Sequence, residues 1–192
     1  MDLDGTTYWI STLFPGELET LTLPAPGFGD LHLSAGEVAE GQLLACTRGF
    51  AECDTGLHGT EGELDGIPIR SELFTIHATS RSTEPACQAL RAAVSQIASA
   101  NAELRGCLPA QPGMLLPEPL DVPGCTVSRG LLVVPWVWGP QVPHLAEKHR
   151  QTMMLQLLML TEEEAQYAHT YGVGALQEEM VNTGINVMEW TR

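Results

Sequence analysis

The chain has 192 residues, 44% of them hydrophobic, and its 24 acidic against 9 basic residues give a formal net charge of −15. This length is enough for one sizeable hydrophobic core. Because so few Lys and Arg are available to neutralise phosphates, the charge argues against nucleic acid as a ligand. It fits a solvated acidic surface or a surface complementary to a basic protein partner.

The sequence also gives expectations about the compartment. No stretch reaches the roughly twenty apolar residues needed to cross a membrane, and Met1–Asp4 lacks the basic region and apolar core of a signal peptide. We therefore expect a cytoplasmic protein that has no membrane contact. Reduced thiols are expected as well, because the cysteines are odd in number and scattered: Cys46, Cys53, Cys87, Cys107 and Cys125.

The first third of the chain predicts short strands and loops. Thr6–Leu13 is β-branched and aromatic and predicts a strand, with which the alternating segment Glu19–Leu23 could pair. Pro24–Gly29 predicts a loop, and Gly41–Cys46 a further strand. Residues 48–65 are rich in Gly, Asp, Glu and Thr without periodicity, so they predict a long exposed connection.

The middle of the chain predicts a strand, a helix and another strand. Apolar residues reach both faces of Ile67–Ala78, which is typical of a strand entering a core. Ser82–Leu104 has the i, i+3, i+4 apolar stripe of a helix. Pro109–Gly124 holds five prolines and predicts irregular structure. Gly130–Trp138 predicts a strand in which Pro135 forces an edge or a bulge.

The C-terminal segment has the clearest local signals. Met153–Leu160 is a nearly unbroken apolar run, typical of a strand buried on both faces. Thr161 and Glu164 have the spacing of a capping box and predict a helix that follows directly. Tyr171–Gly172 predicts the end of this helix and Gly174–Asn182 a second one.

These elements predict one α/β domain of the α+β kind over residues 1–192, with a central mixed β-sheet flanked by helices. A division into two domains at the loop of residues 48–65 is the alternative.

The motifs predict neither a metal or cofactor site nor catalysis. Cys46, Cys53 and His58 lack a CxxC pair, and His144 and His149 do not form HExxH. There is no GxSxG elbow and no phosphate-binding glycine loop. We therefore predict that the protein is not an enzyme.

Residues of the types used in catalysis have structural explanations here. The glutamates at 162–164 diverge around a helix, and their capping role accounts for them. Cys87 and Cys107 flank a helix and are expected in the core, since free cysteine buries readily. His77 ends a strand and is expected to be structural.

The order of segments resembles the suppressor of fused family in its compact bacterial single-domain form. The most specific match is the apolar strand Met153–Leu160 followed by Thr161–Ala168, then Gly184–Val187 and the closing Trp190–Arg192. Ile67–Leu73 resembles the strand that the family places before its long helix. The resemblance covers residues 65–192, whereas residues 1–64 match poorly.

The resemblance implies a mixed α/β domain without a catalytic centre that binds another protein. Animal members of the family restrain a transcription factor, and bacterial relatives resemble immunity proteins that neutralise a cognate toxin. An acidic surface would suit a basic toxin. The alternatives are a small cytoplasmic hydrolase or transferase with an unrecognised Cys/His site, and a scaffold domain of a larger assembly.

Binding residues favour loops on a rigid scaffold, which makes two stretches candidates for the binding surface: the acidic part of the connection, Glu52–Asp65, and the proline-rich segment Pro109–Gly124. Trp136 and Trp138 would share one face of their predicted strand, either as binding anchors or as core packing. The predicted partner-binding residues are Glu52, Asp54, Glu61, Glu63, Asp65, Trp136 and Trp138.

Overall fold

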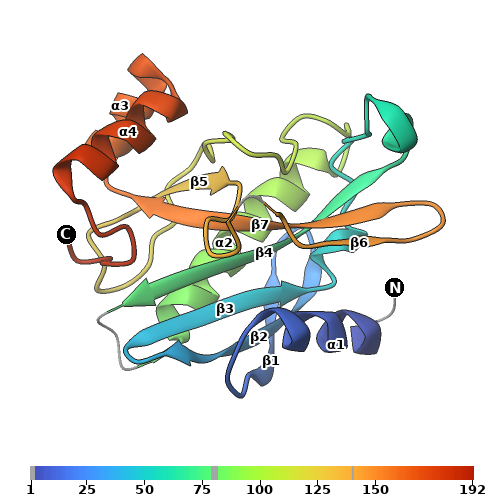
Figure 1. Ribbon diagram of the computed structural model, residues 1–192, viewed down its shortest axis with the longest axis horizontal. Coiled ribbons are helices and arrows are strands. Elements are labelled where there is room, and N and C mark those ends of the chain that lie inside the picture. Colours follow the sequence, from blue (N-terminus) through green and yellow to red (C-terminus); the bar gives the residue numbers. More distant parts are fainter. Residues whose placement is uncertain (1–2, 79–81, 140) are drawn as a thin grey trace.

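The computed structural model describes residues 3–78, 82–139 and 141–192, which form one seven-stranded sheet with helices on both of its faces and at one end (Figure 1). The helices are α1 (Leu3–Leu13), α2 (Glu84–Asn101), α3 (Glu162–Tyr171) and α4 (Val173–Thr183), with the short 3-10 turns η1 (Phe50–Glu52) and η2 (Gly62–Leu64). The strands are β1 (Glu19–Ala25), β2 (Gly29–Ala39), β3 (Gln42–Arg48), β4 (Ile69–Ala78), β5 (Arg129–Val133), β6 (His144–Ala146) and β7 (Gln151–Leu160). Of the helices described, none is long and apolar enough to cross a membrane.

The sheet is mixed, as the sequence predicts. Strands β1 to β4 form an antiparallel meander, and β4 then pairs with β7 in parallel. Parallel neighbours need a long crossover, which here contains α2 and the proline-rich segment. The outer edge of β7 pairs with β6 at residues 151–153 and with β5 at residues 156–160. The predicted fold class, a mixed sheet flanked by helices, is therefore confirmed.

Alternating side chains of the central strands fill two cores on opposite faces of the sheet. On β3 and β4, Ala45 and Leu73 face α2, which covers one face in Figure 1. Leu44 and Phe74 point the other way and pack against α1 through Ile10. Because both faces are covered, these strands are apolar on both sides, which is the pattern that the sequence shows for Ile67–Ala78.

The junction between β7 and α3 confirms the local C-terminal signals. All but one residue of β7 are buried. The Thr161 hydroxyl accepts a hydrogen bond from the Glu164 amide, and the Glu164 carboxylate accepts one from the Thr161 amide, so the capping box forms. Helices α3 and α4 then pack on each other and on the end of the sheet in a third apolar cluster (Figure 1).

The N-terminal prediction is wrong: the segment expected to be a strand is α1. Thr6, Trp9 and Ile10 are buried at helical spacing, so one face of the helix packs on the sheet. The Thr7 hydroxyl bonds to the Leu3 carbonyl one turn back, which keeps this polar group compatible with a helix. Packing of one face thus overrides the strand propensity of the β-branched residues.

Three other segments differ from the sequence-based expectations. Strand β1 pairs with β2 and runs on to Ala25, so the predicted loop is only a tight turn before Gly29. Strand β5 ends at Val133, well before Trp138. The connection of residues 48–65 is partly internal, because it contains η1 and η2 and buries Phe50.

Candidate binding surface

A buried carboxylate holds the start of the acidic connection. Glu72 of β4 is fully buried, and its two oxygens accept hydrogen bonds from the amides of Gly49 (2.7 Å), Phe50 (3.1 Å) and Ala51 (3.3 Å). The Thr47 hydroxyl donates to the same carboxylate at 2.5 Å. These amides open η1 and would otherwise lack acceptors. Glu72 therefore fixes the direction in which the chain leaves β3.

The protonation of Glu72 depends on pH near neutrality. Removal from water raises the pKa of Glu72 to about 7, although the hydrogen bonds from Thr47 and the η1 amides act in the opposite direction. The Thr47 oxygen also accepts the Leu73 amide at 2.8 Å, so its hydrogen is directed at the carboxylate. The turn at η1 therefore rests on a group that is itself sensitive to pH.

Two of the predicted partner-binding carboxylates form ion pairs with arginines of the same chain. Asp54 accepts from the guanidiniums of Arg70 (2.7 Å) and Arg105 (2.9 Å). Burial alone would raise the pKa of Asp54, but the Gly56 amide and these two arginines hold it below its ordinary value. Glu52 pairs with Arg150 at 2.9 Å. Both carboxylates thus fasten the connection to the scaffold, and their predicted role in partner binding stays a prediction.

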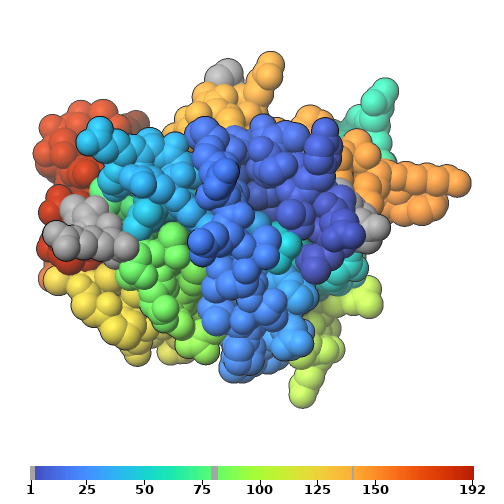
Figure 2. All heavy atoms as spheres, turned by 90° about the horizontal axis from the view of Figure 1, so that it is seen from below, coloured from blue at the N-terminus to red at the C-terminus, as the bar shows by residue number. Residues whose placement is uncertain are grey.

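The remaining acidic candidates lie on a closed hairpin, residues 57–69, which we call the acidic hairpin. Its base is joined by a hydrogen bond from the Ile69 amide to the Leu57 carbonyl at 2.9 Å. Gly59 allows its two arms to meet, because a Cβ at this position would lie 2.0 Å from the Leu64 carbonyl oxygen. The hairpin projects beside the loop between β6 and β7, as two views show (Figures 1 and 2).

The tip of the acidic hairpin presents three carboxylates to solvent. Glu61, Glu63 and Asp65 are all exposed, and none forms an ion pair within residues 3–78, 82–139 and 141–192. Backbone hydrogen bonds across the hairpin fix the tip, including one from the Gly66 amide to the Gly59 carbonyl at 3.0 Å. The sequence predicted that these residues are exposed and bind a partner, but it did not predict the closed hairpin that holds them.

An apolar hollow of about 430 Å³ lies against the acidic hairpin. It is lined by the first half of β4 and β7, by the hairpin, by residues 110–112 of the proline-rich segment and by the chain after β5. Glu61 is the only carboxylate among the described residues around it, and no Lys or Arg is among them. The apolar side chains include Leu57, Leu64, Ile69, Val134, Met153 and Leu155.

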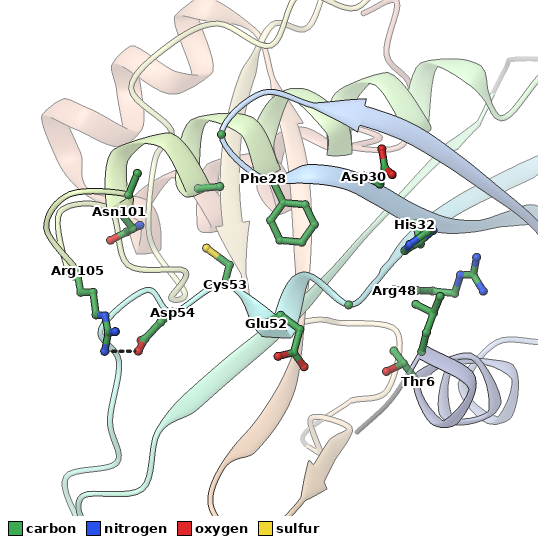
Figure 3. A pocket seen from close by; sticks show the side chains of 15 residues that line it. Thr6, Phe28, Asp30, His32, Arg48, Glu52, Cys53, Asp54, Asn101 and Arg105 are labelled. Carbon is green, nitrogen blue, oxygen red and sulfur yellow. Dashed lines mark ion pairs between the residues drawn. The ribbon is translucent and has the colours of Figure 1, made fainter.

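A second hollow of about 690 Å³ is lined by residues 48–54, by the turn between β1 and β2 and by the end of α2 (Figure 3). Two of its polar side chains bond to the scaffold: Arg48 donates to the Thr7 hydroxyl, and the Asn101 amide donates to the Ile97 and Leu108 carbonyls. Burial raises the pKa of the Cys53 thiol, which opposes nucleophilic activation. Among the described residues that line this hollow, the Cys53 thiol forms no hydrogen bond to a base.

The two predicted tryptophan anchors differ. Trp138 packs against the rings of Phe14 and Phe74, each 5.2 Å between centroids, and its indole nitrogen donates to the Leu13 carbonyl. Trp136 is 45% exposed and lies beside α4. Because β5 ends before both residues, the prediction that they share a strand face is wrong. Trp136 is the more exposed of the two, Trp138 is half-buried, and the role of both in partner binding stays a prediction.

The cysteines and His77 show no catalytic arrangement. Cys87 is buried as predicted, whereas Cys107 is exposed, so its predicted place in the core is wrong. His77 is 1% exposed, and its ring lies 5.0 Å from that of Trp190. In the described parts of the chain no cluster of His, Cys, Asp and Glu could hold a metal ion.

Comparison with known proteins gives a result only at the level of structure. No family model matches the sequence, and no curated protein matches it. A crystal structure from Neisseria gonorrhoeae, described as a SUFU (suppressor of fused protein) homolog, superposes with a TM-score of 0.64 over 100% of this chain and 96% of its own, at 14% identity. The chain has a suppressor-of-fused-like fold.

Two further structures share this fold. The Sufu–Fu complex matches with a TM-score of 0.57 and 13% identity, covering 92% of this chain and 82% of the other. Drosophila Suppressor of Fused matches with a TM-score of 0.53 and 14% identity, and there 96% of this chain spans only 44% of the relative. The suppressor-of-fused-like fold thus extends to the described residues before 65, where the sequence resemblance is poor. The extent of a single domain over residues 1–192 stays a prediction.

Proposed function

We propose that the chain is a non-enzymatic protein-binding domain, an immunity protein of a bacterial cell that neutralises a basic toxin by direct contact. The suppressor-of-fused-like fold supports a binding role, since one of the similar structures is that of a complex with a protein partner. The Cys/His alternative has no support from geometry, because no hydrogen bond joins a cysteine to a histidine in the described part of the chain.

The observation that carries the proposal is the acidic hairpin. Its three exposed carboxylates are held by a closed backbone, so binding would cost little ordering entropy. Carboxylates without internal partners attract a basic surface over a distance near the Debye length and speed its encounter.

The test uses the product of the reading frame that neighbours the gene. We expect the two purified proteins to form a complex, and we expect the chain to suppress the growth arrest that the neighbouring product causes. A neutralised variant, Glu61→Gln with Glu63→Gln and Asp65→Asn, should associate at least about tenfold more slowly at low salt. This difference should shrink as ionic strength rises.

The matched control removes the same net charge elsewhere. Glu40, Glu178 and Glu179 are exposed and lie outside the acidic hairpin, and their triple Gln variant should bind within about twofold of the unmodified chain. Failure to form a complex or to relieve growth arrest would contradict the immunity role. Equal slowing by both triple variants would contradict the assignment to the hairpin.

A further inference from the structure

The apolar hollow beside the acidic hairpin is built into the sheet. The outer edge of β7 is paired by β6 up to Met153 and by β5 from Gln156 onward, so the ladder is interrupted between them. Leu155 lies in this interruption and lines the hollow. The interruption leaves apolar side chains of the core strands facing a concave surface.

The walls of this hollow are fixed before any partner arrives. Pro135 is buried on one side, and the Ser71 hydroxyl bonds to the Ala110 carbonyl at 3.3 Å on the other. The acidic hairpin closes the third side through the hydrogen bond between Leu57 and Ile69. A volume of about 430 Å³ has room for one large apolar side chain. Preformed apolar concavities of this kind are where interfaces place their anchors.

The charges around the hollow indicate what kind of segment would carry that side chain. Glu61 lines the hollow, and Glu63 and Asp65 follow it on the same hairpin tip. No Lys or Arg is among the described residues that line the hollow. A segment that inserts an apolar side chain here therefore brings its neighbouring residues against carboxylates, and basic neighbours fit them.

We propose that this hollow takes one large apolar side chain, aromatic or aliphatic, from a basic segment of the partner protein. The inference rests on the proposed function and names the element that the partner would use. The carboxylates of the hairpin tip speed association, and burial of the apolar side chain in the hollow slows dissociation. The two contributions separate in an experiment because different residues supply them.

The test follows backbone amide signals by NMR during titration with three capped pentapeptides, Lys-Lys-Phe-Lys-Lys, Lys-Lys-Gly-Lys-Lys and Glu-Glu-Phe-Glu-Glu. We expect the basic Phe peptide to shift amides of residues 57–71 and 153–155. The Gly peptide should bind about thirtyfold more weakly, the effect of one buried aromatic side chain. The acidic Phe peptide should bind at least about tenfold more weakly than the basic one.

A pair of matched variants places the site. Val134 is 44% exposed at the wall of the hollow, and Val181 is 81% exposed on α4, outside it. Val134→Lys should weaken binding of the basic Phe peptide at least about tenfold, whereas Val181→Lys should change the affinity for this peptide by less than about twofold. The amide spectra of both variants also show whether the fold is retained.

Several outcomes would overturn this inference. These are no shift with the basic Phe peptide at millimolar concentration, equal binding of the Phe and Gly peptides, an unchanged affinity in Val134→Lys, or shifts outside the hollow. A dimer of the unmodified chain that Val134→Lys dissociates would show that a second copy covers the hollow. In one further outcome the Phe and Gly peptides bind equally, and the triple variant Glu61→Gln, Glu63→Gln and Asp65→Asn abolishes the binding of both. The proposed function would then stand, but the role of the hollow would be refuted.

Discussion

Removal of the Arg192 guanidinium should destabilise the fold more than removal of any exposed arginine. Arg192 donates to both carboxylate oxygens of Glu164, at 2.9 and 2.7 Å, and to the carbonyls of Met159 (2.8 Å) and Glu189 (2.6 Å). It thus joins the last strand, the first turn of α3 and the final segment. We choose Arg192→Met because it keeps an apolar stem and removes every donor.

The expected loss of stability follows from the burial of the ion pair between Arg192 and Glu164. The side chains of Arg192 and Glu164 are 13% and 12% exposed, so the pair is largely desolvated. Breaking a fully buried pair costs about 3–5 kcal/mol, and a hydrogen bond to a charged group contributes about 1.5–3 kcal/mol. We expect Arg192→Met to lower the free energy of unfolding by about 3 kcal/mol, because Glu164 would keep only its bond to the Thr161 amide. At this chain length the Tm should fall by about 6–12 °C.

Urea unfolding followed by circular dichroism measures this free energy. Arg105→Met is the matched control, since Arg105 also pairs with a carboxylate, Asp54, but is 73% exposed. It should cost less than about 1 kcal/mol. A cycle that combines Arg192→Met with Glu164→Gln should give a coupling of about 2 kcal/mol. The reasoning would be refuted by a loss in Arg192→Met no larger than in Arg105→Met, or by a coupling near zero.

Three further predictions concern pH, backbone geometry and thiols. Burial raises the pKa of Glu72 in the folded state from 4.5 to about 7, so the folded state holds an extra proton between these pH values. The free energy of unfolding should therefore fall by about 3 kcal/mol as pH rises from 4 to 8. In Glu72→Gln the free energy of unfolding, measured with urea, should vary less with pH over this range. Gly59→Ala should open the acidic hairpin, because its Cβ would meet the Leu64 carbonyl, and faster hydrogen exchange confined to residues 57–69 would show it. Cys107 is exposed whereas burial raises the pKa of Cys87 to about 11, so a thiol reagent at pH 7.5 should label Cys107 well before Cys87; equal rates would contradict this burial.

The parts of the fold that the sequence predicts are those set by neighbouring residues. The capping box of Thr161 and Glu164 lies within one turn, and the apolar run of β7 records burial on both faces. The stripe of α2 is equally local. The α1 segment misleads because its β-branched residues favour a strand locally, while its buried face is chosen by packing against β3 and β4.

The candidate site depends on contacts that no local pattern contains. The acidic residues of the connection are visible in the sequence, but their fates differ by long-range partners: Asp54 meets Arg70 and Arg105, whereas Glu61 meets no cation in the described chain. Trp138 is half-buried because it packs against Phe14, far away in the sequence. The hollow cannot be predicted from the sequence because separate segments form it: β4, β7, the hairpin, the proline-rich segment and the chain after β5.

Net charge alone is therefore a poor guide to what a partner meets. Several carboxylates form contacts within the chain: Glu72 with backbone amides, Asp54 with two arginines, and Glu164 with Arg192. A partner responds to the carboxylates that remain exposed and fixed in place, and the acidic hairpin holds three of them at one tip. Neutralising these three changes the formal charge only from −15 to −12, the same change as in the control triple. If position rather than total charge governs association, the two variants must differ in their association rates although they share that charge.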